Sequence, residues 1–162
     1  MGIKRNRGGN AVTDLLLTTF RLNGAFLAAA DDIAAPSGLT AARWQVLGTL
    51  MWDNMTVSSV AHEMGLSRQA VQRIANVLAD EGMIVFIDNP ADKRAKLAAA
   101  TDAGRAAIAS LAERQHQWAN SVASKIDPDE IEQAVEIMRQ VLTACLKSTD
   151  KDLSASRGQN AT

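Results

Sequence analysis

A single cysteine, Cys145, and no tyrosine occur in the 162 residues of this chain. One cysteine excludes an intramolecular disulfide and fits a reducing compartment, so we expect a cytoplasmic protein. No apolar run approaches the roughly 18 residues needed to cross a bilayer, and we expect no membrane partner. Near the start, Asp14 and Arg21 interrupt the apolar residues, which argues against a signal peptide.

The sequence also lacks the residue groupings that catalysis and metal binding need. No nucleophile, base and orienting group cluster together, and no glycine-rich phosphate loop is present, so we expect no enzyme. The two histidines, His62 and His116, are far apart, and "HEMG" lacks the second histidine of a metalloprotease. We therefore expect no metal and no cofactor. The lack of tyrosine also disfavours the base-stacking platform of an RNA-binding module.

No excess of either charge is available, because 17 basic residues face 18 acidic ones. Taken as a whole, the chain therefore predicts no polyanionic partner, and a nucleic-acid surface must come from local segregation of charge. Such segregation exists. Residues 2–13 hold three basic residues and no acid, residues 66–79 hold Arg68 and Arg73 and no acid, and residues 127–137 hold five acids and no base.

Apolar periodicity predicts a mainly α protein with one small β-hairpin. A helix begins at Thr13 and is broken by "APSG" at 35–38, and Thr40 caps a second helix through about Trp52. Two short helices follow, one begun by a threonine cap and ended by a glycine, the next capped by Ser67 and running to about Glu81. This is the helix-turn-helix pattern.

The second half of the chain predicts a hairpin and two long helices. "MIVFI" at 83–87 and "AKLAAA" at 95–100 are expected to be strands around a polar turn. One long helix then runs from Thr101 to about Ile126. A last helix starts at Asp127–Pro128 and carries an apolar stripe that includes Cys145. Because a small core could not cover all these apolar faces, we expect a homodimer, with a monomeric bundle as the alternative.

The helix from Ser67 carries two distinct faces. Aliphatic residues cover one arc, and the opposite arc holds only side chains that suit base edges and phosphates, namely Arg68, Gln69, Gln72, Arg73 and Asn76. A plain solvated helix, the alternative, would mix in glutamate and lysine pairs. The polar arc therefore favours a DNA-reading helix.

The hairpin tip, "DNPADKR", is a second candidate contact. It places Lys93 and Arg94 at the apex, and an arginine there can enter a narrow minor groove. Asp92 can hold that guanidinium by a bidentate pair. A charged turn with no function is the alternative.

Four segments carry a resemblance to a known family. "LTAARWQVLGTL", "TVSSVAHEMGLSRQAVQRIANVLADEGMI", "DKRA" and "TDAGR" occur in the order and spacing of MarR-type winged helix-turn-helix regulators, over roughly residues 13–146. The resemblance implies a homodimer with the Ser67 helix in the major groove and Arg94 in the minor groove. It also implies repression that is relieved by a small phenolic or lipophilic ligand.

On this basis the chain divides into a flexible basic arm at 1–10, dimerisation helices at 11–39 and 101–147, a winged helix-turn-helix lobe at 40–100, and a disordered tail at 148–162. Two departures from the family stand out. Phe86-Ile87 replace a basic residue, and Ala98–Ala100 replace a branched one. The wing is therefore expected to be shorter or looser, and the basic arm becomes a candidate supplement for phosphate contacts.

Three aromatic residues, Trp44, Phe26 and Trp118, are candidates for contact with a small aromatic ligand, although tryptophan at helical spacing is more often core. Cys145 suggests a redox-responsive repressor, but its place in an apolar stripe favours a core thiol.

The sequence thus predicts a sequence-specific regulator, most simply a repressor, acting as a homodimer on a pseudo-palindromic operator of double-stranded DNA. Ser67 would anchor the helix end on phosphate, and the polar arc would read bases. The competing hypothesis is a winged helix that binds another protein and has no affinity for DNA.

Overall fold

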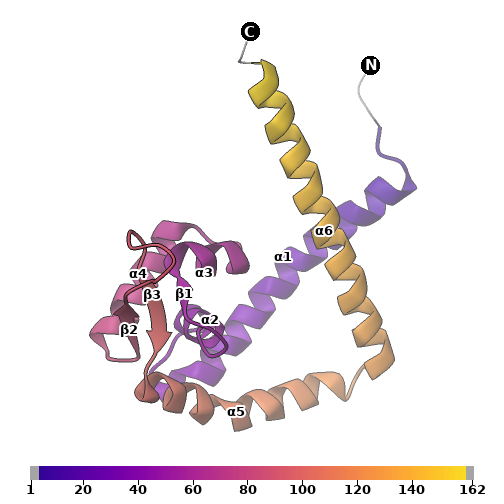
Figure 1. Cartoon of the computed structure of the whole chain (residues 1–162). Helices are drawn as coiled ribbons and strands as arrows, with labels where there is room; N and C mark the ends of the chain where they lie inside the picture. Colours follow the sequence, from indigo (N-terminus) through magenta and orange to yellow (C-terminus); the bar gives the residue numbers. More distant parts are fainter. Residues whose placement is uncertain (1–3, 160–162) are drawn as a thin grey trace. The chain divides into compact units, whose positions relative to one another are not determined.

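The computed structural model describes residues 4–159, with side chains through Ser148. Over these residues the fold is mainly helical with one small antiparallel sheet, as predicted (Figure 1). The elements are α1 (Arg7–Ala34), the 3-10 turn η1 (Ala35–Ser37), α2 (Ala41–Thr49), β1 (Met55–Thr56), α3 (Val57–Met64), α4 (Arg68–Asp80), β2 (Ile84–Ile87), β3 (Leu97–Ala100), α5 (Asp102–Ala123) and α6 (Pro128–Gln159).

The first helix starts earlier than the sequence predicted. α1 begins at Arg7 rather than Thr13, within the stretch expected to be a flexible arm. The side chain of Asn6 accepts a hydrogen bond from the Gly9 amide at 2.8 Å, which caps the helix. Arg5 also donates to the Thr13 hydroxyl at 2.8 Å. Apolar periodicity could not locate this start, because residues 7–10 contain no large apolar side chain.

Two other boundaries differ from the prediction. α6 runs as a helix to Gln159, and residues 160–162 of the tail predicted at 148–162 lie outside the described residues. No glycine or proline interrupts residues 148–157, so a polar composition alone does not end the helix. In the other case α2 ends at Thr49, before Trp52, which lies in the following loop with 92% of its surface exposed.

The core of the lobe forms where α2, α3 and α4 bring their aliphatic arcs together. Val71, Ala75 and Leu78 of α4 are buried, which confirms the predicted inner arc. They meet residues such as Leu47 of α2 and Val60 of α3, both at most 1% exposed. Each large side chain buried in this way contributes roughly 1.5–3 kcal/mol. The core therefore fixes which face of α4 points outward.

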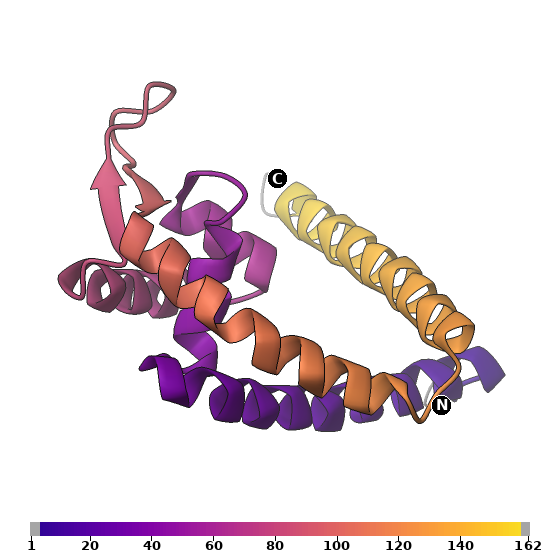
Figure 2. The same cartoon turned by 90° about the horizontal axis from the view of Figure 1, so that it is seen from below.

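The sheet has the order β1-β3-β2, with both pairs antiparallel. β2 pairs with β3 from Ile84 opposite Ala100 to Ile87 opposite Leu97. The sequence missed β1, because two residues are too short to show an alternating pattern. The alanine-rich strand β3 is the central one, and its Ala98 is buried. The loop between β2 and β3 extends away from the neighbouring helices (Figure 2).

A tight joint connects the wing to the start of α5. The Thr101 hydroxyl donates to the Gly82 carbonyl at 2.7 Å and accepts from the Gly104 amide at 3.2 Å. The Thr101 amide donates to the Met83 carbonyl at 3.0 Å. Gly104 is buried, and a Cβ on it would collide with the Met83 carbonyl oxygen. The "TDAG" segment therefore caps α5 and anchors it to the chain just after α4.

Further along α5, Arg114 ties the helix to the end of α1. Its Nε donates to the Ile33 carbonyl at 3.1 Å, and its Nη2 donates to the Ser37 hydroxyl at 2.7 Å. The chain accordingly divides into two units inside α5, with the first ending at Gln115 and the second beginning at His116. α1 and the first half of α5 thus lie in the same unit as the winged lobe.

The joint predicts a specific cost for the substitution Gly104→Ala. Because the added methyl meets backbone and the Leu47 side chain, we expect the free energy of unfolding to fall by roughly 1–3 kcal/mol in urea denaturation. Gly24→Ala in α1 is the matched control, since nothing lies within 4 Å of its Cβ position. It should leave stability unchanged or raise it by up to about 1 kcal/mol. Equal free energies of unfolding for the two variants would show that the close contact at Gly104 does not contribute to stability.

Candidate nucleic-acid interface

A three-residue turn joins α3 to α4. Gly65 ends α3 with a φ of 63°, a left-handed conformation that glycine adopts without strain. The Leu66 amide then donates to the Ala61 carbonyl at 2.9 Å. The Ser67 hydroxyl accepts from the Ala70 amide at 3.1 Å and caps α4. These local hydrogen bonds fix the turn between α3 and α4, and so the angle between the two helices.

The outer face of α4 is polar and free of carboxylates over its first nine residues. An open groove of about 610 Å³ runs along it, lined by all five residues of the predicted polar arc, Arg68, Gln69, Gln72, Arg73 and Asn76. The Gln72 side-chain amide donates to the Asn76 side-chain oxygen at 2.8 Å, which orders both groups on the surface. The structure thus gathers the predicted base-reading residues onto one exposed face.

A second groove, of about 400 Å³, separates α4 from the wing. Three cations lie along it and no acid does, and its lining is Thr56, Val57, Ser58, Arg68, Gln72, Asn76, Phe86, Arg94, Ala95 and Lys96. Sequence reasoning missed Lys96 and Ser58. Their place in the groove depends on how the wing folds against α4 and α3, which no local pattern in the sequence indicates.

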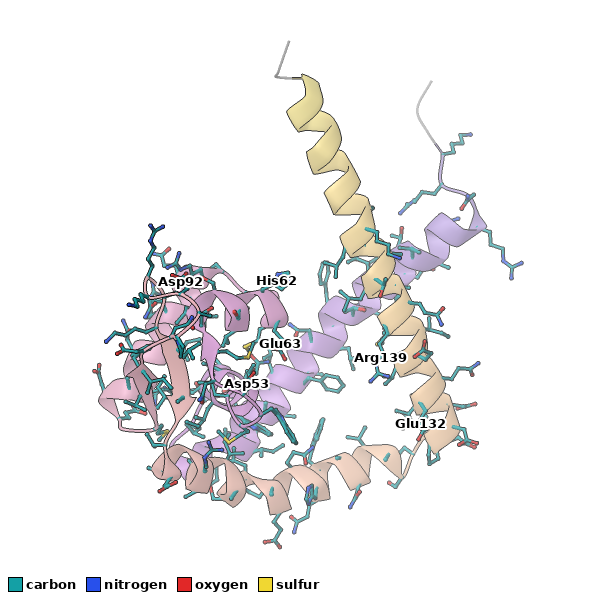
Figure 3. All side chains as sticks on the ribbon, in the orientation of Figure 1. Asp53, His62, Glu63, Asp92, Glu132 and Arg139 are labelled. Carbon is teal, nitrogen blue, oxygen red and sulfur yellow. The ribbon has the colours of Figure 1, made fainter. Side chains whose placement is uncertain are left out.

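The wing tip differs from the prediction in one contact. The Asp92 carboxylate accepts the backbone amide of Arg94 at 2.9 Å, and the Ala95 amide donates to the Asp92 carbonyl at 3.1 Å. Asp92 therefore shapes the turn, and the predicted bidentate pair with the Arg94 guanidinium is wrong for this structure. Lys93 and Arg94 are exposed, as a contact role requires. Figure 3 labels Asp92 on the wing and His62 on α3.

The two acids that follow the polar face are Asp80 and Glu81, at the far end of α4. Glu81 forms an ion pair with Arg43 of α2 at 2.8 Å, and both side chains are partly exposed. An exposed pair of this kind adds little stability, but it offsets the negative charge of Glu81 locally. The negative charge of α4 therefore lies away from Ser67, where the helix would approach a phosphate.

The remaining predicted residues lie elsewhere. The basic N-terminal residues are separated from Ala34 by the length of α1, about 40 Å at 1.5 Å per residue, so they lie far from α4 of the same chain (Figure 1). Trp44 is half-buried on α2 and Phe26 is exposed on α1, both in the first unit, whereas Trp118 is half-buried in the second.

Cys145 is exposed on α6, so the expectation of a core thiol is wrong for the chain described. Within the described residues, no group of three or more histidine, cysteine, aspartate or glutamate side chains is placed to hold a metal ion. In the same part of the chain, no helix has the length and apolar character that crossing a membrane requires.

The turn between α3 and α4, the outward polar helix and the basic wing together define a winged helix-turn-helix protein. The MarR family model matches residues 37–95, which span the lobe from η1 to the wing. Rv2011c, an uncharacterized protein of Mycobacterium tuberculosis, is 30% identical over 133 residues, covering 82% of this chain and 93% of the relative. The chain belongs to the MarR family of DNA-binding transcriptional regulators, which are not enzymes.

Solved structures share the fold. CouR from Rhodococcus jostii RHA1, bound to p-coumaroyl-CoA, is 26% identical with a TM-score of 0.65, over 82% of this chain and 91% of that one. MosR of Mycobacterium tuberculosis, in complex with DNA, is 24% identical with a TM-score of 0.66, over 80% of this chain and 96% of that one.

Proposed function

We propose that this regulator is a repressor that binds a pseudo-palindromic site in double-stranded DNA as a homodimer. The main support is the outer face of α4, where five polar or cationic side chains line one open groove without a carboxylate. Guanidinium and amide groups match the hydrogen-bonding edges of guanine and adenine in the major groove. Ser67, at the start of the helix, is exposed and retains a hydroxyl proton for a phosphate.

The wing supplies the second contact. Its loop extends beyond the helices of the lobe and carries Lys93 and Arg94 at exposed positions. A cation there can enter the minor groove, where the negative potential of the two strands is deepest. The competing hypothesis, a winged helix that binds only proteins, does not account for the exclusion of acids from both α4 and the groove beside it.

A homodimer is supported by apolar surface on α1 and α6. Leu16, Leu17 and Phe20 of α1 are 49–64% exposed, and Leu142 and Leu146 of α6 are 61% and 55% exposed. Exposed apolar side chains gathered on one helix are costly in water, and a second copy of the chain can cover them. Two copies would present two α4 helices to successive turns of one duplex.

A small aromatic or lipophilic ligand is the proposed signal for release. The support is that CouR, a relative of similar fold, is bound to p-coumaroyl-CoA. In this chain the aromatic candidates are Phe26, Trp44 and Trp118. The redox-responsive alternative depends on Cys145, which lies on α6.

Salt dependence tests the DNA contact. For the wild type, we expect log affinity for duplex DNA to fall linearly with log salt, by about 0.9 for each phosphate neutralised. Replacing Arg73 and Arg94 together by alanine should weaken binding and flatten this slope. Arg139→Ala on α6 removes one positive charge from the second unit and should leave the slope unchanged (Figure 3). Binding that is absent or insensitive to salt would refute the proposal.

Light scattering at micromolar concentration tests the dimer. We expect the wild type to have the mass of two chains, and Leu142→Glu to have the mass of one, because a carboxylate would be buried without a partner. Gln140→Glu, two residues away on the same helix, should remain dimeric. A wild type with the mass of one chain, or a dimeric Leu142→Glu variant, counts directly against this interface.

A further inference from the structure

The groove between α4 and the wing has two walls from different elements. α4 contributes Arg68, Gln72 and Asn76, which are spaced by four residues and so form one ridge along the helix. The wing contributes Arg94 and Lys96 on the other side. The same three residues of α4 also border the open groove on its outer face. Gln69 and Arg73 line that outer groove only. Arg68 thus lies on the ridge of α4 that separates the outer groove from the groove beside the wing.

Duplex DNA has a strand that could occupy the groove between α4 and the wing. A major groove and the adjacent minor groove are separated by one sugar-phosphate strand. A protein that places a helix in the first and a wing in the second must straddle that strand. In this chain the space between the two elements is the groove of about 400 Å³. This step depends on the function proposed above, because it takes α4 and the wing as the two contacts.

The lining of the groove suits such a strand. Three cations face it from two sides, and no carboxylate lines it to repel a phosphate. Lys96 is exposed and makes no ion pair or side-chain hydrogen bond within the described part of the chain, so its ammonium can bind an anion without giving up a partner. Ser58 adds an exposed hydroxyl donor. Hydrogen bonds from cationic donors to a phosphate oxygen are short and strong, and they carry no sequence information.

We propose that one backbone phosphodiester of the operator is held between Arg68 of α4 and Lys96 of the wing. Arg68 then positions the duplex, and it does not read a base. Base reading falls to Gln69 and Arg73 on the outer face, together with the paired side chains of Gln72 and Asn76. Lys96 becomes a DNA-contacting residue that sets the depth at which the lobe sits on the strand.

The test uses the full-length protein and a duplex that it binds, synthesised with one neutral methylphosphonate at a time along each half-site. In the wild type, neutralising the phosphate in the groove should weaken binding roughly tenfold. Lys96→Ala should weaken binding to the unmodified duplex by a smaller factor, and the penalty at that one position should shrink, because fewer cations still face the phosphate. Arg68→Ala should do the same and should weaken all operator sequences uniformly.

Two further variants serve as controls. Lys93→Ala removes the same charge three residues away on the wing, outside the groove, and should keep the penalty at that phosphate. Lys96→Arg should also keep it, because the charge remains. If Lys96→Ala shows the wild-type penalty at every phosphate, this inference is wrong while the DNA-binding function stands. If the wild type binds no duplex, both fail.

Discussion

The spacing between α4 and the wing depends on one joint, where Thr101 and Gly104 contact the backbone of Gly82 and Met83. This joint places the end of α4, the start of β2, the end of β3 and the start of α5 at one point. The pairing of β2 with β3 spans only four residues and β1 adds two more, so the sheet alone gives the wing little stability. With its base fixed, the wing faces α4 across a groove of defined width. The proposed binding of a DNA strand between α4 and the wing depends on this fixed base.

The distribution of charge in the lobe also favours contact with DNA. The chain has a net charge of −1, so it gains nothing from its total field in approaching DNA. The two grooves beside α4 are nevertheless lined by arginine, lysine and neutral polar side chains, without a carboxylate. Glu81, at the far end of the helix, is paired with Arg43. The absence of acids over this surface is the feature that a protein-binding winged helix would not need.

Much of the fold and of the polar face of α4 could be predicted from the sequence, because local interactions define the helix-turn-helix. Thr40, Thr56 and Ser67 each cap a helix through their own side chains, and Gly65 ends one by its backbone conformation. What escaped prediction depends on contacts distant in sequence or on weak local signals. Asn6 caps a helix whose first residues include two glycines, and β1 is two residues long. Lys96 gained its role only when the folded wing brought it to α4, and Asp92 bonded to the backbone instead of a guanidinium.

Two copies of this chain are proposed to read a duplex with paired α4 helices. Selection of bound duplexes from a random pool tests this proposal. We expect enrichment of one pseudo-palindromic sequence, with half-sites centred about 10–10.5 base pairs apart, and its loss in a variant with alanine at Gln69 and Arg73. Recovery of no preferred sequence, or of a single half-site without a symmetric partner, would contradict it.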